Sequence, residues 1–132
     1  MERVPQTHEE EPMPTPLCDI DALAAAAPTV SATGVLWKLT ESGRQLDANL
    51  VRLAPGRHIA PHAEPDLDVL VLVVSGAGTF GAGTEGEPLP LVAGSLFWLP
   101  HGSTRSITAG DDGLAYLTVH RRRPGMQIGR AR

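Results

Sequence analysis

The stretch GRHIAPHAEPDLDVLVLVVSGAGTF, residues 56–80, decides the expected fold. Its run VLVLVV at 69–74 is rich in β-branched residues and leads into a Gly-X-Gly turn, a pattern typical of a strand. A strand with one face in water alternates polar and apolar residues, and this one does not, so we expect both faces to be covered. In a small barrel the second cover is another sheet layer or a second subunit, and the run therefore predicts a homodimer.

The remaining chain is typical of an all-β sandwich or barrel. From Gly34 onward about nine short apolar segments follow one another at 8–12-residue spacing, separated by turn residues. The first two, at 34–41 and 46–55, flank the sequence SGRQ and predict a hairpin. The 14 glycines and 12 prolines suit short strands joined by tight turns. Before them, residues 17–27 predict a short helix that Asp19 or Asp21 caps and Pro28 ends.

Length and charge define the expected domain organisation. At 132 residues the chain predicts one domain. Residues 1–16 hold four glutamates, one arginine and four prolines, and we expect a disordered acidic N-terminal tail. Residues 17–132 then form a single barrel domain with its core at 34–121.

Composition argues against several classes of partner. The formal net charge is −4, and an acidic body disfavours nucleic acid as a partner because phosphate binding needs a basic face. The arginine run at 121–123 is interpreted as a solvated strand end. No apolar run is long enough to span a bilayer, so we expect no membrane association. The single cysteine, Cys18, excludes an internal disulfide, and we expect a cytoplasmic protein.

Two glycine-framed motifs resemble those of the cupin family. Gly56, His62 and Gly76 match the separations of its first motif, G-x5-H-x-H-x(3,4)-E-x6-G. Gly94, Pro100 and Gly102 match the frame of its second, G-x5-P-x-G-x2-H-x3-N. The resemblance covers roughly residues 34–121 and implies a double-stranded β-helix, or jelly-roll barrel. It implies much less about activity, because this fold carries enzymes, binding modules and storage proteins.

The resemblance implies a site in which most of the family's metal ligands have changed. The first histidine remains as His62, the second falls at Glu64, the glutamate at Val69 and the last histidine at Arg105. One metal hypothesis survives: His62, Glu64 and a rotated Asp68 binding Fe, Mn, Ni or Zn in a dioxygenase or isomerase. Arg105 argues against it, since a permanent cation would repel the metal. We therefore expect no cofactor, with a divalent metal as the alternative.

The same residues suit metal-independent chemistry. If His62 points into the barrel, Glu64 does too, because residues two apart on a strand share a face. Glu64 and Arg105 can then form an interior ion pair. Alternatively, Arg105 binds the acid group of a small anionic or carbonyl-containing ligand, and His62 beside Glu64 acts as general base. His62 as an ordinary core histidine is an equally open interpretation.

Further candidates line the expected pocket. His101 lies in a turn at the barrel mouth, and Trp98 and Tyr116 are large side chains whose face the apolar pattern does not decide. His120 ends the last strand and is expected to be exposed. A third hypothesis keeps the barrel filled by side chains, as a non-catalytic structural or ligand-sensing module.

Overall fold

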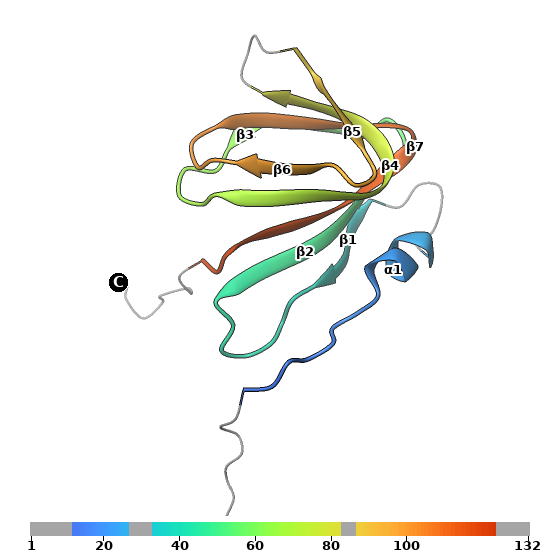
Figure 1. Ribbon diagram of the computed structural model, residues 1–132. Helices are drawn as coiled ribbons and strands as arrows, with labels where there is room; N and C mark the ends of the chain where they lie inside the picture. The colour runs from blue at the N-terminus through green and yellow to red at the C-terminus, as the bar shows by residue number, and fades with distance from the viewer. Residues whose placement is uncertain (1–11, 27–32, 83–86, 124–132) are drawn as a thin grey trace, which may run out of the picture.

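The computed structural model describes residues 12–26, 33–82 and 87–123. Within them the chain forms one helix and seven strands (Figure 1). The helix α1 is Ile20–Ala26, and the strands are β1 Gly34–Lys38, β2 Leu46–Leu53, β3 His58–Ala63, β4 Val69–Ala82, β5 Leu89–Val92, β6 Leu96–Leu99 and β7 Thr104–Arg121.

Two long bent strands build the barrel. The second half of β7 pairs with β2 and with the first half of β4, which also pairs with β6. The first half of β7 pairs with β3 and with the second half of β4, which also pairs with β5. All of these pairings are antiparallel, and the strands curl into two facing layers (Figure 1). The all-β jelly-roll barrel predicted from the sequence is confirmed.

The seven strands replace the nine that were expected. Residues 104–109 and 114–121 belong to one strand, as do 69–74 and the segment around 77–82. The pairing of β4 with β7 continues past register shifts at Val73/Ser75 and Gly76/Gly78. The glycines that were interpreted as turns between strands therefore mark bends within continuous strands. A bulge reorients a strand without ending its pairing.

Gly76 allows β4 to bend against β7. Its φ is 79°, a left-handed conformation that favours glycine. A Cβ at this position would lie 2.2 Å from the carbonyl oxygen of Gly113 on β7. The glycine is required both by its backbone conformation and by the close approach of the second strand.

The core fills the space between the two layers. On β4, Val69, Val71 and Val73 are buried, whereas the alternating Leu70 and Leu72 are 45% and 36% exposed. The inner positions pack with aromatic and aliphatic residues from the other strands, including a Phe80–Phe97 pair with ring centroids 5.5 Å apart. Within the single chain the outer face of VLVLVV is only partly covered, at one end by α1, and its cover by a second subunit stays a prediction.

The short helix α1 lies on the outside of the barrel (Figure 1). Asp19 caps it, since its Oδ1 accepts a hydrogen bond of 3.0 Å from the amide of Ala22. Residues 12–19 form no regular element and line shallow grooves together with β1 and β2. Of the acidic tail expected at residues 1–16, positions 1–11 lie outside the described residues. No helix in the described ranges is long and apolar enough to cross a membrane.

Candidate functional site at the open end of the barrel

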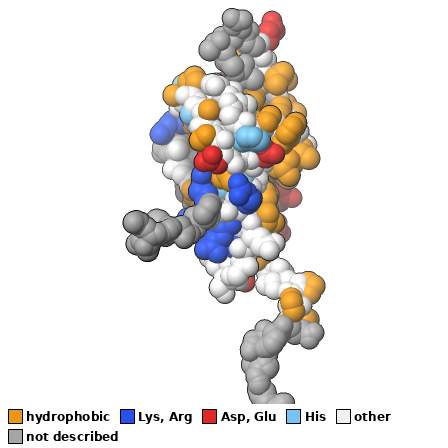
Figure 2. All heavy atoms as spheres, turned by 90° about the vertical axis from the view of Figure 1, so that its left-hand side faces the viewer, with side chains coloured by type: hydrophobic (Ala, Val, Ile, Leu, Met, Phe, Trp, Pro, Cys, Tyr) orange, Lys and Arg blue, Asp and Glu red, His pale blue; other side chains and the backbone are white. Residues whose placement is uncertain are grey.

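Polar residues gather at the end of the barrel where β7 both begins and ends. The chain reverses at Asp111 and Asp112, so Thr104 and Arg121 return to one end of the barrel. Figure 2 looks onto this end and shows Arg, Asp, Glu and His side chains gathered there. Two hydrogen bonds tie its loops: Gly102 N–H to the Glu64 carbonyl at 2.7 Å, and Arg121 Nη2 to the Asp66 carbonyl at 3.2 Å.

Arg105 is a buried cation near the start of β7. It shares the inner face of β7 with Ile107 and Ala109, which belong to the core, and it is 6% exposed. Its Nη1 makes two long hydrogen bonds, to the carbonyl oxygen and Oγ of Ser103 at 3.3 and 3.5 Å. No carboxylate of the described residues forms an ion pair with it. A guanidinium held this weakly retains donors for an anion from outside.

His62 lies next to Arg105. The two residues are direct partners in the pairing of β3 with β7. The Nδ1 of His62 lies 3.0 Å from the carbonyl oxygen of Ala60, which can only accept, so Nδ1 carries the proton. The neutral ring then keeps a lone pair on Nε2, and the side chain is exposed. His62 and Arg105 are therefore neighbours on adjacent strands at this end of the barrel.

Glu64 does not pair with Arg105. Its Oε1 accepts a hydrogen bond of 2.7 Å from Nη2 of Arg123, and its Oε2 accepts one of 3.0 Å from the amide of Asp66. These two hydrogen bonds, the one from Arg123 above all, lower the pKa of Glu64; Arg105 adds only a weaker electrostatic effect. The hypothesis of an interior Glu64–Arg105 pair is therefore wrong. Glu64 is instead the partner of Arg123.

Asp68 and His101 form a separate pair outside the barrel. Oδ1 of Asp68 accepts hydrogen bonds from the backbone N–H of His101 at 2.8 Å and from its Nδ1 at 2.7 Å. The side chains of His101 and Asp68 are 64% and 51% exposed. The hydrogen bond from the His101 ring, followed by that from its backbone, lowers the pKa of Asp68. His101 is thus held toward solvent and does not reach the interior.

The three residues of the metal hypothesis are not brought together. Glu64 is turned to Arg123, and Asp68 is turned to His101. Across residues 12–26, 33–82 and 87–123, no group of three or more His, Cys, Asp or Glu side chains is placed to hold a metal ion. His62, Glu64 and Asp68 as found therefore do not fit a divalent metal.

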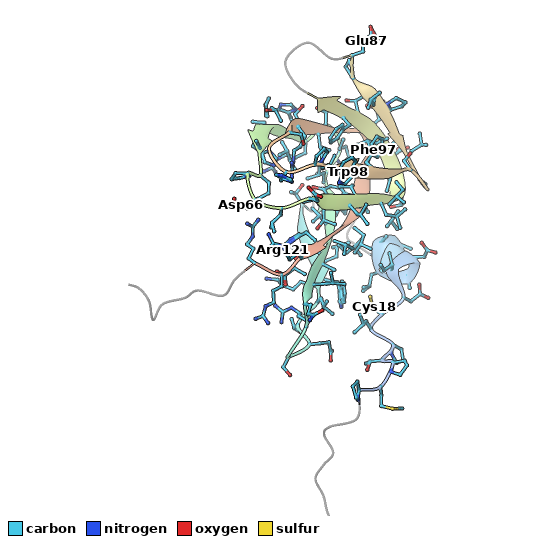
Figure 3. All side chains as sticks on the ribbon, turned by 60° about the vertical axis from the view of Figure 1, so that its left-hand side comes forward. Cys18, Asp66, Glu87, Phe97, Trp98 and Arg121 are labelled. Carbon is cyan, nitrogen blue, oxygen red and sulfur yellow. The ribbon has the colours of Figure 1, made fainter. Side chains whose placement is uncertain are left out.

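The two aromatic candidates lie on opposite faces. Trp98 pairs with Leu70 on the outer face and is 64% exposed, so it does not line the interior (Figure 3). Its neighbour Phe97 points inward and stacks on Phe80. Tyr116 also points inward, but it is packed in the core at 6% exposure, and burial raises the pKa of its hydroxyl.

Sequence reasoning missed a row of polar residues on the inner face. Thr118 and His120 follow Tyr116 with the same parity on β7, and they pair directly with Asn49 and Asp47 on β2. All four are partly buried. The alternation in YLTVH, where Tyr116, Thr118 and His120 alternate with Leu117 and Val119, is the signal that could have revealed them. The expectation of a fully exposed His120 is wrong.

Several solved structures resemble this barrel, although the sequence alone finds no relative. No family model matches the sequence, and no curated protein matches it significantly. Among solved structures, a cupin-2 domain protein from Shewanella frigidimarina is 15% identical over 80% of this chain and 95% of that one, with a TM-score of 0.61. KdgF from Halomonas sp. is 27% identical over 68% of this chain and 80% of that one, with a TM-score of 0.56.

A third similar structure is a sugar phosphate isomerase of the cupin superfamily from Silicibacter pomeroyi. It is 27% identical over 61% of this chain, with a TM-score of 0.53. The chain spans 53% of that isomerase, and only 21% of a similar 11S globulin from Wrightia tinctoria. The pairing of its strands and these similarities define a small jelly-roll barrel. The chain is a cupin barrel, and the resemblance to the cupin superfamily is confirmed.

Proposed function

We propose that the protein binds a small organic acid or phosphate at the open end of the barrel, with Arg105 holding the anionic group. The observation that carries the proposal is the guanidinium of Arg105: it is 6% exposed, and no carboxylate of the described residues pairs with it. A buried charge without a partner costs stability, and a site that keeps one gains from a bound counter-charge.

The surroundings of Arg105 favour a small, partly apolar molecule. Val69 and Leu99 are paired neighbours on the inner face beside this end, and both are buried. Pockets of this kind combine apolar walls with a few polar groups that fix orientation. The similar isomerase acts on a sugar phosphate, which is itself a small anionic molecule.

His62 supplies a base for chemistry on such a ligand. With Nδ1–H donated to the Ala60 carbonyl, Nε2 is free to take a proton from a carbon or hydroxyl next to the acid group. The cation of Arg105 would stabilise the negative charge that develops. We propose proton-transfer chemistry that needs only side chains of this chain, of the isomerase or lyase class.

Binding of inorganic phosphate and of simple carboxylates such as pyruvate, followed by calorimetry, tests the proposal. We expect wild-type protein to bind at least one of them and Arg105→Gln to bind none measurably. Arg57→Gln is the matched control, because Arg57 is exposed in the turn between β2 and β3. Unchanged binding by Arg105→Gln would overturn the proposal.

The role of His62 and the metal alternative need their own measurements. His62→Gln should keep ligand binding within about threefold while abolishing proton exchange into the bound ligand in D₂O. Elemental analysis of the protein as purified tests the divalent-metal hypothesis. Stoichiometric Fe, Mn, Ni or Zn would replace the metal-independent mechanism with metal-assisted chemistry.

A further inference from the structure

A second polar wall faces Arg105 across the barrel. Asn49 and Thr118 are direct partners on β2 and β7, and Val71 on β4 pairs with Thr118 on its other side. Arg105 belongs to the other layer, where it pairs with His62 on β3. The two layers of a β-sandwich lie about 10 Å apart, and inward side chains of both layers fill that distance, so a small molecule held from both sides would lie among these side chains at the end of the barrel.

The side chains of Asn49 and Thr118 have no hydrogen-bond partner among the described residues. Within the described ranges the Asn49 amide and the Thr118 hydroxyl make no hydrogen bond to the protein, and neither is among the buried polar atoms that lack a partner. Both side chains are partly buried. Both share the inner face of this layer with Val51 and Tyr116 of the core region.

His120 extends the same row toward the open end. Its Nδ1 lies 2.7 Å from the carbonyl oxygen of Arg121, so Nδ1 carries the proton and Nε2 keeps a lone pair in the neutral ring. The row therefore presents an amide, a hydroxyl and an imidazole nitrogen. Together they can donate and accept hydrogen bonds.

We infer that the ligand of the proposed site carries hydroxyl groups in addition to its acid group, and that Asn49 and Thr118 recognise them. A hydroxyl both donates and accepts, as do the groups of this wall, whereas a plain alkyl chain would leave them unsatisfied. The inference rests on the proposed function: Arg105 fixes the acid end, and the opposite wall selects hydroxylated acids over their deoxy analogues.

Paired ligands of equal length test this selection on the full chain. The probes are gluconate against hexanoate and glycerate against propionate, measured by calorimetry and by amide chemical shifts. Each hydroxyl that finds a partner should tighten binding about threefold to tenfold, so we expect gluconate to bind at least about tenfold more tightly than hexanoate.

Shape-matched variants assign the effect to the wall. Asn49→Leu and Thr118→Val should each weaken gluconate about threefold to tenfold and leave hexanoate unchanged, whereas Arg105→Gln should weaken both acids. Thr79→Val, at an exposed position of β4, is the control for the threonine change. Retained melting temperatures exclude misfolding as the cause.

The outcomes separate the two proposals. Equal binding of gluconate and hexanoate, both lost in Arg105→Gln, would overturn the hydroxyl selection and leave the acid site standing. Equal losses of both acids in Asn49→Leu would also overturn the selection, since a role in hydroxyl recognition cannot affect hexanoate. Failure of every acid to bind would overturn both.

Discussion

Oε1 of Glu64 lies 2.7 Å from Nη2 of Arg123, a residue 59 positions away in the sequence. Arg105 lies on the same end of the barrel and donates to Ser103 only, within the described part of the chain. Arg123 thus binds the carboxylate that was expected to pair with Arg105. The fold leaves the buried guanidinium available, and this separation of partners underlies the proposed site.

Replacing Arg105 should separate stability from binding. We expect Arg105→Met to retain or raise the free energy of unfolding, because it removes a buried charge that pairs with no carboxylate of the described residues and keeps much of the side-chain volume. The same variant should not bind phosphate or carboxylates. Urea denaturation and calorimetry on one preparation measure both effects.

A different outcome would point to an internal partner. Breaking a buried ion pair costs about 3–5 kcal/mol. A loss of that size in Arg105→Met would mean that Arg105 is held by a carboxylate of the protein, in conflict with its two weak contacts to Ser103.

The Glu64–Arg123 pair should make the stability of the folded protein depend on pH in the acidic range. Arg123 lowers the pKa of Glu64 in the folded protein below its ordinary value of 4.5. A lowered folded pKa means that the stabilisation is present above the unfolded pKa and is lost as the pH falls through the folded one. Wild-type stability should therefore decline below about pH 4.5, and Glu64→Gln should decline less steeply there.

The measurement is the melting temperature between pH 3 and pH 7. Asp112→Asn serves as the control, since Asp112 is exposed in the turn at the other end of the barrel. Parallel pH profiles for wild type and Glu64→Gln would contradict the assignment of this pair.

The outer face of β4 and β6 should form the contact between two copies of the chain. Leu70 pairs with Trp98 and Leu72 with Leu96, and these four outward side chains are 36–64% exposed. Hydrophobic side chains gather along one flank of the molecule in Figure 2. A contiguous exposed apolar face of this kind marks an interaction surface in a soluble protein.

Analytical ultracentrifugation at micromolar concentration tests the dimer. We expect a dimer for wild type, and a dissociation constant raised about thirtyfold or more by Trp98→Lys, since large aromatic side chains dominate such contacts by about 2 kcal/mol or more. Val35→Lys is the control, because Val35 is 58% exposed on β1 instead. A monomeric wild type would rule out the predicted homodimer.

Gly76 should be the least replaceable of the motif glycines. Gly76→Ala imposes a left-handed φ on an alanine, at a cost of about 1–2 kcal/mol, and also places a methyl group 2.2 Å from the Gly113 oxygen. Gly56→Ala has a similar φ of 76° but meets no atom within 4 Å. We expect Gly56→Ala to lose about 1–2 kcal/mol and Gly76→Ala clearly more, as measured by chemical denaturation.

The barrel itself could be predicted from the sequence because its signals are local. Apolar runs such as 69–74, glycines at bends and the capping Asp19 each act within a few residues. The helix start at Asp19 and the hairpin of β1 and β2 are confirmed for the same reason.

The partners of charged side chains could not be predicted in this way. Glu64 was expected to pair with Arg105, or to bind a metal with His62 and Asp68. In the structure Glu64 binds Arg123 and Asp68 binds His101. A long charged side chain can pair with any of several groups within its reach. Because β7 returns to the open end, it places Arg123 close enough to bind Glu64 in place of Arg105. Sequence distance carries no information about that choice.

The sequence by itself determined the barrel and the end at which His62 and Arg105 meet, since strand periodicity and glycine positions act locally. Only the tertiary structure decided that Trp98 lies outside, that Asn49 and Thr118 lie inside, and that Arg105 has no acidic partner among the described residues. The physical reason is pairing register: which strands lie side by side fixes which side chains share a face, and register is set by contacts between distant segments.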